Sequence, residues 1–150
     1  MRIVVASDHA GVELRREMAE EARSLGHEVT DLGPAPGEAI DYPVNGARVG
    51  RLVAAGEYDL GMLVCGTGIG ISIAANKVRG VRAVVCSEPF SARLSREHNN
   101  ANVLAVGARV VGPGLAPMIV REWQEAEFEG GNERHVRRVG LIEDPENVAG

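Results

Sequence analysis

Leu60–Ser72, with the sequence LGMLVCGTGIGIS, decides the fold and points to the functional site. Its first six residues form an apolar run, bounded by glycine, that is typical of a buried strand. The run ends in Cys65, and Gly66, Gly68 and Gly70 follow at alternate positions. These glycines allow a tight turn and present backbone N–H groups at the start of a helix, where the helix dipole favours an anion. The motif therefore predicts a strand, a turn and a helix that hold a phosphate, a carboxylate or a developing oxyanion.

Cys65 lies where these amides converge, and we expect it to have a larger thiolate fraction than a free cysteine. Taken alone, Cys65 is better explained as a buried structural residue, because cysteine is among the most often buried residue types. The three glycines spaced two apart, with Thr67 between them, favour the functional interpretation. Thr67 is either an N-cap of the helix or a hydroxyl that polarises a substrate oxygen.

Other ligand-binding templates fit the chain less well. The glycine spacing does not match the Gly-x-Gly-x-x-Gly dinucleotide fingerprint, and the motif follows the third strand-like run rather than the first. A Walker loop needs a lysine directly after its last glycine, whereas the only lysine is Lys77. A metal site built from Cys65, Cys86, His9 and His98 would need a coincidence of folding, and the chain has no Cys-x-x-Cys spacing. We therefore expect no metal.

The composition excludes several classes of partner. The 150 residues are 45% hydrophobic, which predicts a single domain spanning residues 1–150. Aromatic residues are only 3%, too few for a surface that stacks nucleic-acid bases, and the net charge of -5 opposes nucleic acid and anionic membranes. No basic and apolar leader precedes Ile3, and no apolar run approaches the ~20 residues of a membrane span. We expect a cytoplasmic protein with Cys65 and Cys86 as free thiols.

Strand-like runs alternate with segments of helical periodicity along the chain. The runs are Ile3–Ala6, His27–Asp31, Leu60–Cys65, Arg82–Cys86 and Val103–Val106. This alternation is typical of βαβ units, so we predict an α/β fold, a Rossmann-like three-layer sandwich with a five-stranded parallel sheet. An extra C-terminal helix is expected at about residues 133–142, before a polar tail at 143–150.

Polar residues follow several of these strands at the end of the sheet where ligands bind. In an open parallel sheet, ligands lie beyond the carboxyl ends of the strands. Asp8 and His9 follow the first strand, the Cys65 motif follows the third, and Arg109 lies just past the fifth. Asp8 either caps the first helix or holds sugar hydroxyls, and His9 either points into solvent or meets an anion.

The C-terminal half carries further candidates, each with a structural alternative. His98 and Asn99 close the fourth helix, where a histidine near the negative helix end and an asparagine stop are ordinary features. Arg134 and Arg138 are four residues apart in the last helix and share a face, so they can clamp a phosphate. The alternative is a solvated basic face beside Glu133.

Taken together, these residues resemble the ribose-5-phosphate isomerase B family, which includes the galactose-6-phosphate isomerase subunits. The resemblance covers nearly the whole chain and is carried by Ser7–Gly11, Asp41–Pro43, Cys65–Lys77, Arg82–Cys86, Arg96–Asn99 and Arg134–His135 with Arg138. It implies an enzyme without a metal or other cofactor that interconverts ribose 5-phosphate and ribulose 5-phosphate. Allose, galactose or tetrose phosphates are alternative substrates, and a non-catalytic phosphate- or nucleotide-binding module is the alternative function.

The resemblance also implies a catalytic role for several residues. Cys65 corresponds to the base that moves a proton between C1 and C2 through an enediolate. Some members carry a glutamate a few positions along the same loop, but Ile69–Ser72 contain none, so the chain resembles the cysteine type. His98 corresponds to the acid and base that opens the sugar ring, helped by Asp8.

The remaining site residues would bind the substrate. The enediolate oxygens would be held by Thr67 and the amides of Gly66, Gly68 and Gly70. The sugar hydroxyls would be held by Tyr42 and Asn99. The phosphate would be held by His9, Arg109, Arg134 and Arg138. Asn132 and Glu133 are extra residues relative to the commoner family pattern. They directly precede Arg134, so they affect which arginines of this helix occupy the phosphate-binding positions of the family.

The order of the strands places His98 far from Cys65. His98 precedes the fifth strand, so we expect it near the opposite edge of the sheet from Cys65, which ends the third strand. A single chain then does not join the two residues, and the resemblance implies sites shared between subunits. We therefore expect a homodimer or tetramer in which one subunit's His98 reaches its partner's Cys65.

Overall fold

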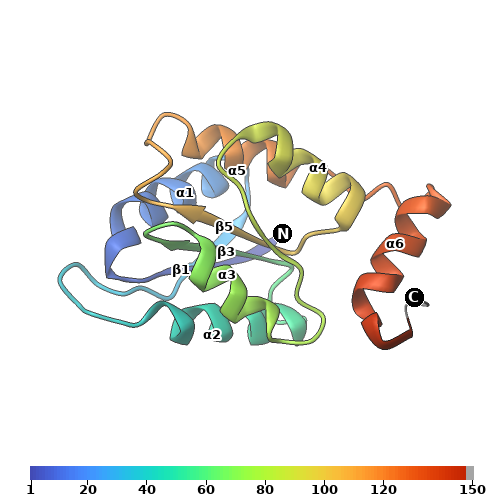
Figure 1. Ribbon diagram of the computed structural model, residues 1–150. Coiled ribbons are helices and arrows are strands. Elements are labelled where there is room, and N and C mark those ends of the chain that lie inside the picture. Colours follow the sequence, from blue (N-terminus) through green and yellow to red (C-terminus); the bar gives the residue numbers. More distant parts are fainter. Residues whose placement is uncertain (148–150) are drawn as a thin grey trace.

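Five parallel strands form one sheet in the order β2-β1-β3-β5-β4 (Figure 1). The strands are β1 (Arg2–Ser7), β2 (Glu28–Asp31), β3 (Leu60–Cys65), β4 (Ala83–Val85) and β5 (Val103–Gly107). The computed structural model describes residues 1–147 of the chain. The first and last residues of each strand agree with those of its predicted run to within one residue. The predicted α/β three-layer fold is confirmed.

Helices cover both faces of the sheet, as the alternation along the strands requires. On one face, Ile3 and Val5 of β1 pack in a core with residues of α1, α4 and α5. On the other face, Val4 and Ala6 pack with residues of α2 and α3. These helices are α1 (Val12–Ser24), α2 (Tyr42–Ala54), α3 (Ile69–Asn76), α4 (Pro89–Asn99) and α5 (Ala116–Glu125).

The central strand β3 is buried along its whole length because both of its faces are covered. Its neighbours are β1 and β5, with Val64 opposite Ser7 and Cys65 opposite Gly107. This register brings the carboxyl ends of the three strands level with one another. The loops that follow them therefore meet at one end of the sheet.

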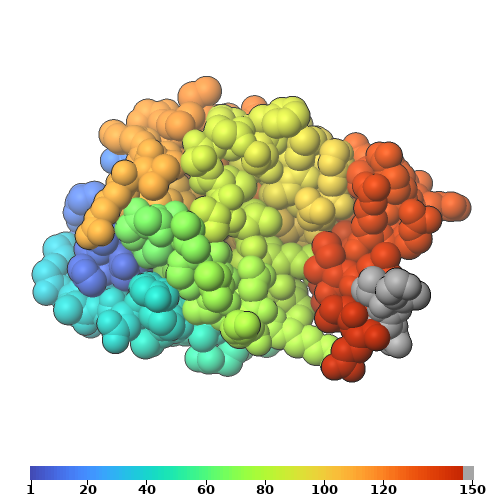
Figure 2. Space-filling model, viewed as in Figure 1, coloured from blue at the N-terminus to red at the C-terminus, as the bar shows by residue number. Residues whose placement is uncertain are grey.

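The last helix, α6 (Glu133–Glu143), stands at the other end of the molecule (Figures 1 and 2). It contacts α4, and Arg82 in the connection before β4 forms an ion pair with Glu143. Val136 and Ile142 are about half exposed, at 47% and 52%. The helix thus has an apolar surface that residues 1–147 leave partly uncovered.

Two short 3-10 helices complete the described chain. η1 (His9–Gly11) joins β1 to α1, and η2 (Pro145–Asn147) follows α6. Within residues 1–147, every helix is too short or too polar to cross a membrane. In α5, Ile119 and Trp123 are buried, whereas Met118 is 56% exposed.

Candidate active site

A hollow of about 390 Å³ opens where the loops after β1, β3 and β5 meet. We call it the Cys65 hollow, and it is lined by Asp8, Tyr42, Cys65, Gly66, Thr67, Ile69, Gly70 and Arg109. All of these residues except Ile69 are sequence candidates. The structure therefore gathers one part of the predicted site at the carboxyl edge of the sheet, where an open parallel sheet binds ligands.

Cys65 is the last residue of β3 and is 3% exposed. Its Sγ accepts a hydrogen bond of 3.1 Å from the backbone N–H of Gly68. Gly68 has a φ of 79°, a left-handed conformation that glycine adopts without strain, and α3 begins at the next residue. This hydrogen bond fixes the sulfur at the start of the helix. The turn thus holds the thiol at the wall of the Cys65 hollow.

The same turn is packed tightly against β5. A Cβ built on Gly107 would lie 2.7 Å from the backbone C and O of Thr67, closer than real Cβ atoms come. The glycine at 107 therefore allows the Cys65 loop to lie on the end of β5. For Thr67, a helix N-cap is one of two interpretations; its hydroxyl is 3.4 Å from the N–H of Ile69, while Gly68 is the N-cap residue.

We predict that Gly107→Ala destabilises the protein by about 1–3 kcal/mol, because the added methyl group must displace the Thr67 backbone. The measurement is urea denaturation followed by circular dichroism. Gly112→Ala is the matched control, since a Cβ there meets no atom within 4 Å. Equal denaturation midpoints for the two variants would contradict the packing argument.

Asp8 is held beside Cys65 by the end of β1. Its backbone N–H donates to the carbonyl of Val64 at 3.0 Å, and its Oδ1 accepts from the N–H of Ala10 at 2.9 Å. The carboxylate therefore caps η1, which is the structural interpretation, and it also lines the Cys65 hollow, as the functional interpretation requires. The cap uses only Oδ1 of the carboxylate, so capping η1 does not exclude a second role for Asp8.

Arg15 is a buried arginine that the sequence patterns did not identify, and it fixes Ser7, the residue before Asp8. Arg15 of α1 is 3% exposed, and its Nη1 donates at 2.9 Å both to Ser7 Oγ and to the carbonyl of Pro34. Its Nε lies 2.9 Å from Asp31 Oδ1 at the end of β2. Buried charges need such partners, so this network ties α1, β1, β2 and the following loop together. Its only sequence signal is a charged residue next to Leu14 on the apolar side of the helix.

Tyr42 and Arg109 form two walls of the Cys65 hollow. Tyr42, the first residue of α2, packs its ring against the backbone of Gly70, where a Cβ would lie 2.6 Å from the ring. The Arg109 guanidinium lies over Gly66, with Nη1 3.3 Å from a Cβ built there. It therefore places a positive charge beside the glycine turn. His9 is exposed beside the hollow, with Nδ1 3.4 Å from the carbonyl of Ile40.

The other candidates do not lie at the Cys65 hollow of the same chain. Helix α4 runs back from the carboxyl end of β4 to the amino end of β5, so His98 near its end lies at the opposite end of the sheet (Figure 1). Asn99 lines another hollow beside Arg82 and Ile142. Arg134 and Arg138 lie in α6. We call His98, Asn99, Arg134 and Arg138 the His98 group.

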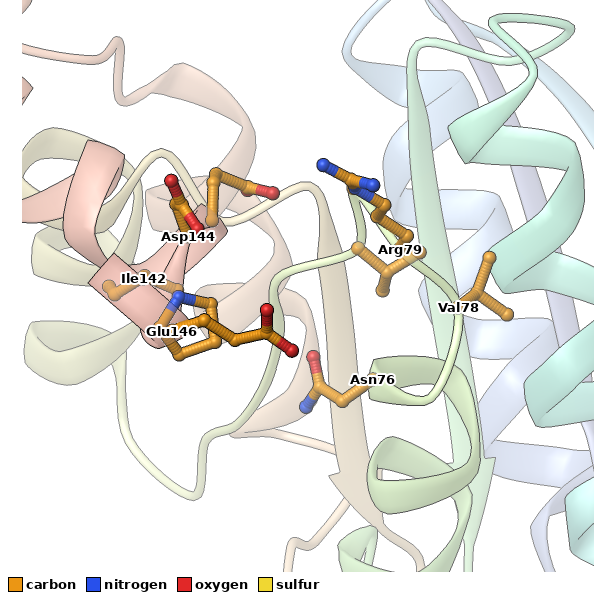
Figure 3. A pocket seen from close by; sticks show the side chains of 10 residues that line it. Asn76, Val78, Arg79, Ile142, Asp144 and Glu146 are labelled. Atoms are coloured by element: carbon orange, nitrogen blue, oxygen red, sulfur yellow. The ribbon is translucent and has the colours of Figure 1, made fainter. Parts of the chain in front are cut away.

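A second hollow, of about 370 Å³, lies between the connection after α3 and the end of α6 (Figure 3). Asn76 and Arg79 face Asp144 and Glu146 across it (Figure 3). None of the sequence candidates lines it, and its walls carry charges of both signs. It forms where α6 meets the body of the molecule, so we place the candidate active site at the Cys65 hollow.

One group in the described part of the chain has the chemistry of metal ligands. It comprises His98, Glu129 and His135, whose ligand atoms lie within 4.8 Å of one another. The two imidazole rings are stacked at an interplanar angle of 12°, which points their in-plane lone pairs alongside each other instead of toward one ion. Arg134 Nη2 is also 3.5 Å from His135 Nε2. The arrangement does not fit a metal site.

Comparison with known proteins identifies close relatives over nearly the full chain. The model of the Ribose/Galactose Isomerase family matches residues 3–142. Ribose-5-phosphate isomerase B from Escherichia coli K12 is 53% identical over 141 residues, which are 94% of this chain and 93% of that protein.

Two solved structures extend the comparison to three dimensions. Ribose-5-phosphate isomerase B of Clostridium thermocellum is 53% identical with a TM-score of 0.92, covering 97% of each chain. The Mycoplasma genitalium enzyme, solved with bound ribulose-5-phosphate, is 39% identical with a TM-score of 0.89, covering 99% of this chain and 97% of that one.

Proposed function

The chain belongs to the Ribose/Galactose Isomerase family, and we propose that it interconverts ribose 5-phosphate and ribulose 5-phosphate through an enediolate. The observation that carries this proposal is the Cys65 thiol, which accepts a hydrogen bond from the backbone N–H of Gly68. The thiol lines a hollow together with Asp8, Thr67 and Arg109. The likeness to a structure solved with ribulose-5-phosphate supports the choice of sugar.

The chemistry follows from the placement of Cys65. In the open-chain aldose, the thiolate takes the proton from C2, the electrons of the C–H bond form the C1–C2 double bond, and the electrons of the C1 carbonyl move onto O1 to give an enediolate. A proton then passes from O2 to O1, and the thiol returns a proton to C1 as the C2 carbonyl forms, which gives the ketose and regenerates the thiolate. Negative charge develops on the sugar oxygens beside the glycine turn, where backbone N–H groups and the Thr67 hydroxyl stabilise it. The Arg109 guanidinium lies beside the same turn, over Gly66, and can therefore bind an anionic group of the same substrate.

Ring opening and phosphate binding need the His98 group, so we propose that the active site is shared between two subunits. Ribose 5-phosphate is mostly cyclic, and its ring must accept and release protons before Cys65 can act. Within one chain, the His98 group lies at the other end of the sheet from the Cys65 hollow. A homodimer that joins each Cys65 hollow to the His98 group of its partner completes both sites.

The surface of the chain supports this assembly. Exposed apolar side chains lie on α3, on α4 and on α6, and comprise Ile69, Ile73, Phe90, Val136, Leu141 and Ile142. Phe90, at 70% exposed, is the most exposed of them. Apolar side chains this exposed would be covered where two subunits meet, so they are candidates for a subunit interface. We further propose that the enzyme works in the cytoplasm, where a reducing environment keeps Cys65 a free thiol.

The proposed substrate is tested by comparing kcat/KM for ribose 5-phosphate, allose 6-phosphate, galactose 6-phosphate and erythrose 4-phosphate. We expect the highest value with ribose 5-phosphate, with the ribulose 5-phosphate product identified by NMR. A higher value with another sugar phosphate would reassign the substrate. Binding of ribose 5-phosphate in calorimetry without any isomerisation would instead indicate a binding module and overturn the enzyme proposal.

A further inference from the structure

We propose that His135 is a positioning residue for His98, which it holds by ring stacking in the orientation that ring opening requires. The two imidazoles are stacked, with centroids 4.3 Å apart and planes inclined by 12°. This inference rests on the proposed role of His98 and assigns a task to a side chain that the proposed mechanism does not otherwise use.

The stack constrains His98 in a specific way. His98 is partly exposed near the end of α4, where a lone imidazole would rotate freely. A second ring on its face fixes the plane of the His98 ring but leaves the edge, which carries both nitrogens, open to a substrate. Acid and base catalysis depends on the direction of that edge, because proton transfer requires hydrogen-bond reach and alignment.

His135 is itself held firmly. It is 3% exposed and is the only buried residue of α6, all of which lies in the described part of the chain. Its backbone N–H donates to the carbonyl of Asn132 at 2.9 Å, and the Asn132 side chain caps the helix. The N–H of Glu129 donates to the carbonyl of Glu97 at 2.9 Å, so the segment before α6 is tied to the residue adjacent to His98. The stack therefore joins two elements that are already fastened to each other.

The charges around His135 suit this role. Burial lowers the pKa of His135, and His98, Arg134 and Arg138 lower it further, whereas Glu129 raises it. Glu129 Oε2 and Arg134 Nη2 lie 3.3 Å and 3.5 Å from His135 Nε2, so the ring has one acceptor and one donor beside it. With its pKa lowered, His135 is neutral at neutral pH and places no positive charge against the face of the His98 ring.

The test compares two reactions of the same dimeric enzyme. Conversion of ribose 5-phosphate needs ring opening. Exchange of a C1 hydrogen of ribulose 5-phosphate with D2O does not, because O5 carries the phosphate and the ketose cannot close a five-membered ring. For His135→Ala we expect kcat for ribose 5-phosphate to fall by about tenfold to a hundredfold, with KM and the exchange rate nearly unchanged. His135→Phe keeps a flat ring on His98 and should recover much of the lost rate.

Three outcomes separate the possible roles. Equal loss of both reactions in His135→Ala and in His135→Phe would make His135 merely structural and overturn the proposal, and so would unchanged rates in both variants. His98→Ala is the reference and should lose conversion while keeping exchange. If His98→Ala keeps full conversion, the proposed role of His98 fails, which is a distinct result. His27→Ala, which removes an imidazole near the N-terminus, is the matched control and should leave both rates unchanged.

Discussion

Replacing Cys65 by alanine is expected to lower kcat for ribose 5-phosphate by at least about a thousandfold, which is about 4 kcal/mol of transition-state stabilisation. The Gly68 amide and the rest of the turn would remain, but no base would be left at the end of β3. Exchange of a C1 hydrogen of ribulose 5-phosphate with D2O should fall by the same factor, because the same base serves both. Initial rates and NMR measure the two effects.

Cys65→Ser sharpens this test because it keeps the size of the side chain. A serine hydroxyl ionises far less readily than a thiol, so the variant should bind substrate normally and still be inactive. Cys86→Ala is the matched control. Burial and, to a smaller extent, Glu88 raise the pKa of Cys86 to about 11, and the residue does not line the Cys65 hollow. Its removal should leave kcat within about twofold. An active Cys65→Ala enzyme would end the proposed mechanism.

The fold and the Cys65 hollow were predictable because their signals are local. The apolar run before Cys65 and the glycines after it specify a strand, a turn and a helix within a few residues. Alternation of strands and helices then fixes a parallel sheet, and a parallel sheet places the ends of its strands together. Asp8 and Arg109 reach the hollow for that reason, since both lie within two residues of the ends of strands that neighbour β3.

The parts that escaped prediction depend on contacts between distant segments. Arg15 is one helix turn into α1, and only the packed structure shows that Ser7, Asp31 and Pro34 surround it. The stack of His98 on His135 joins residues whose helices have ordinary patterns when each is considered alone. Hydrophobic periodicity indicates which face of a helix is buried, but it does not specify the partner of a partly exposed histidine.

Mixing two inactive variants, Cys65→Ala and His98→Ala, is expected to restore about a quarter of the wild-type activity toward ribose 5-phosphate. Random exchange of subunits at equal amounts makes about half of the dimers mixed. A mixed dimer has one site that lacks both residues and one site that has both. The measurement is the initial rate after subunit exchange, with the fraction of mixed dimers determined from two different affinity tags.

The positions of Cys65 and His98 in one chain make this experiment distinguish a shared site from a site within a single subunit. Cys65 lies at the carboxyl edge of the sheet, whereas His98 is near the end of a helix that returns to the amino edge, so a complete site within one chain would require α4 to be repacked. Mixing Cys65→Ala with Cys65→Ser is the control and should restore nothing, because no pairing of those chains supplies the thiol. Purified mixed dimers of the first pair that remain inactive would show that His98 does not act across the interface. The His98 group would then need a different task, and the uncovered apolar face of α6 a different partner.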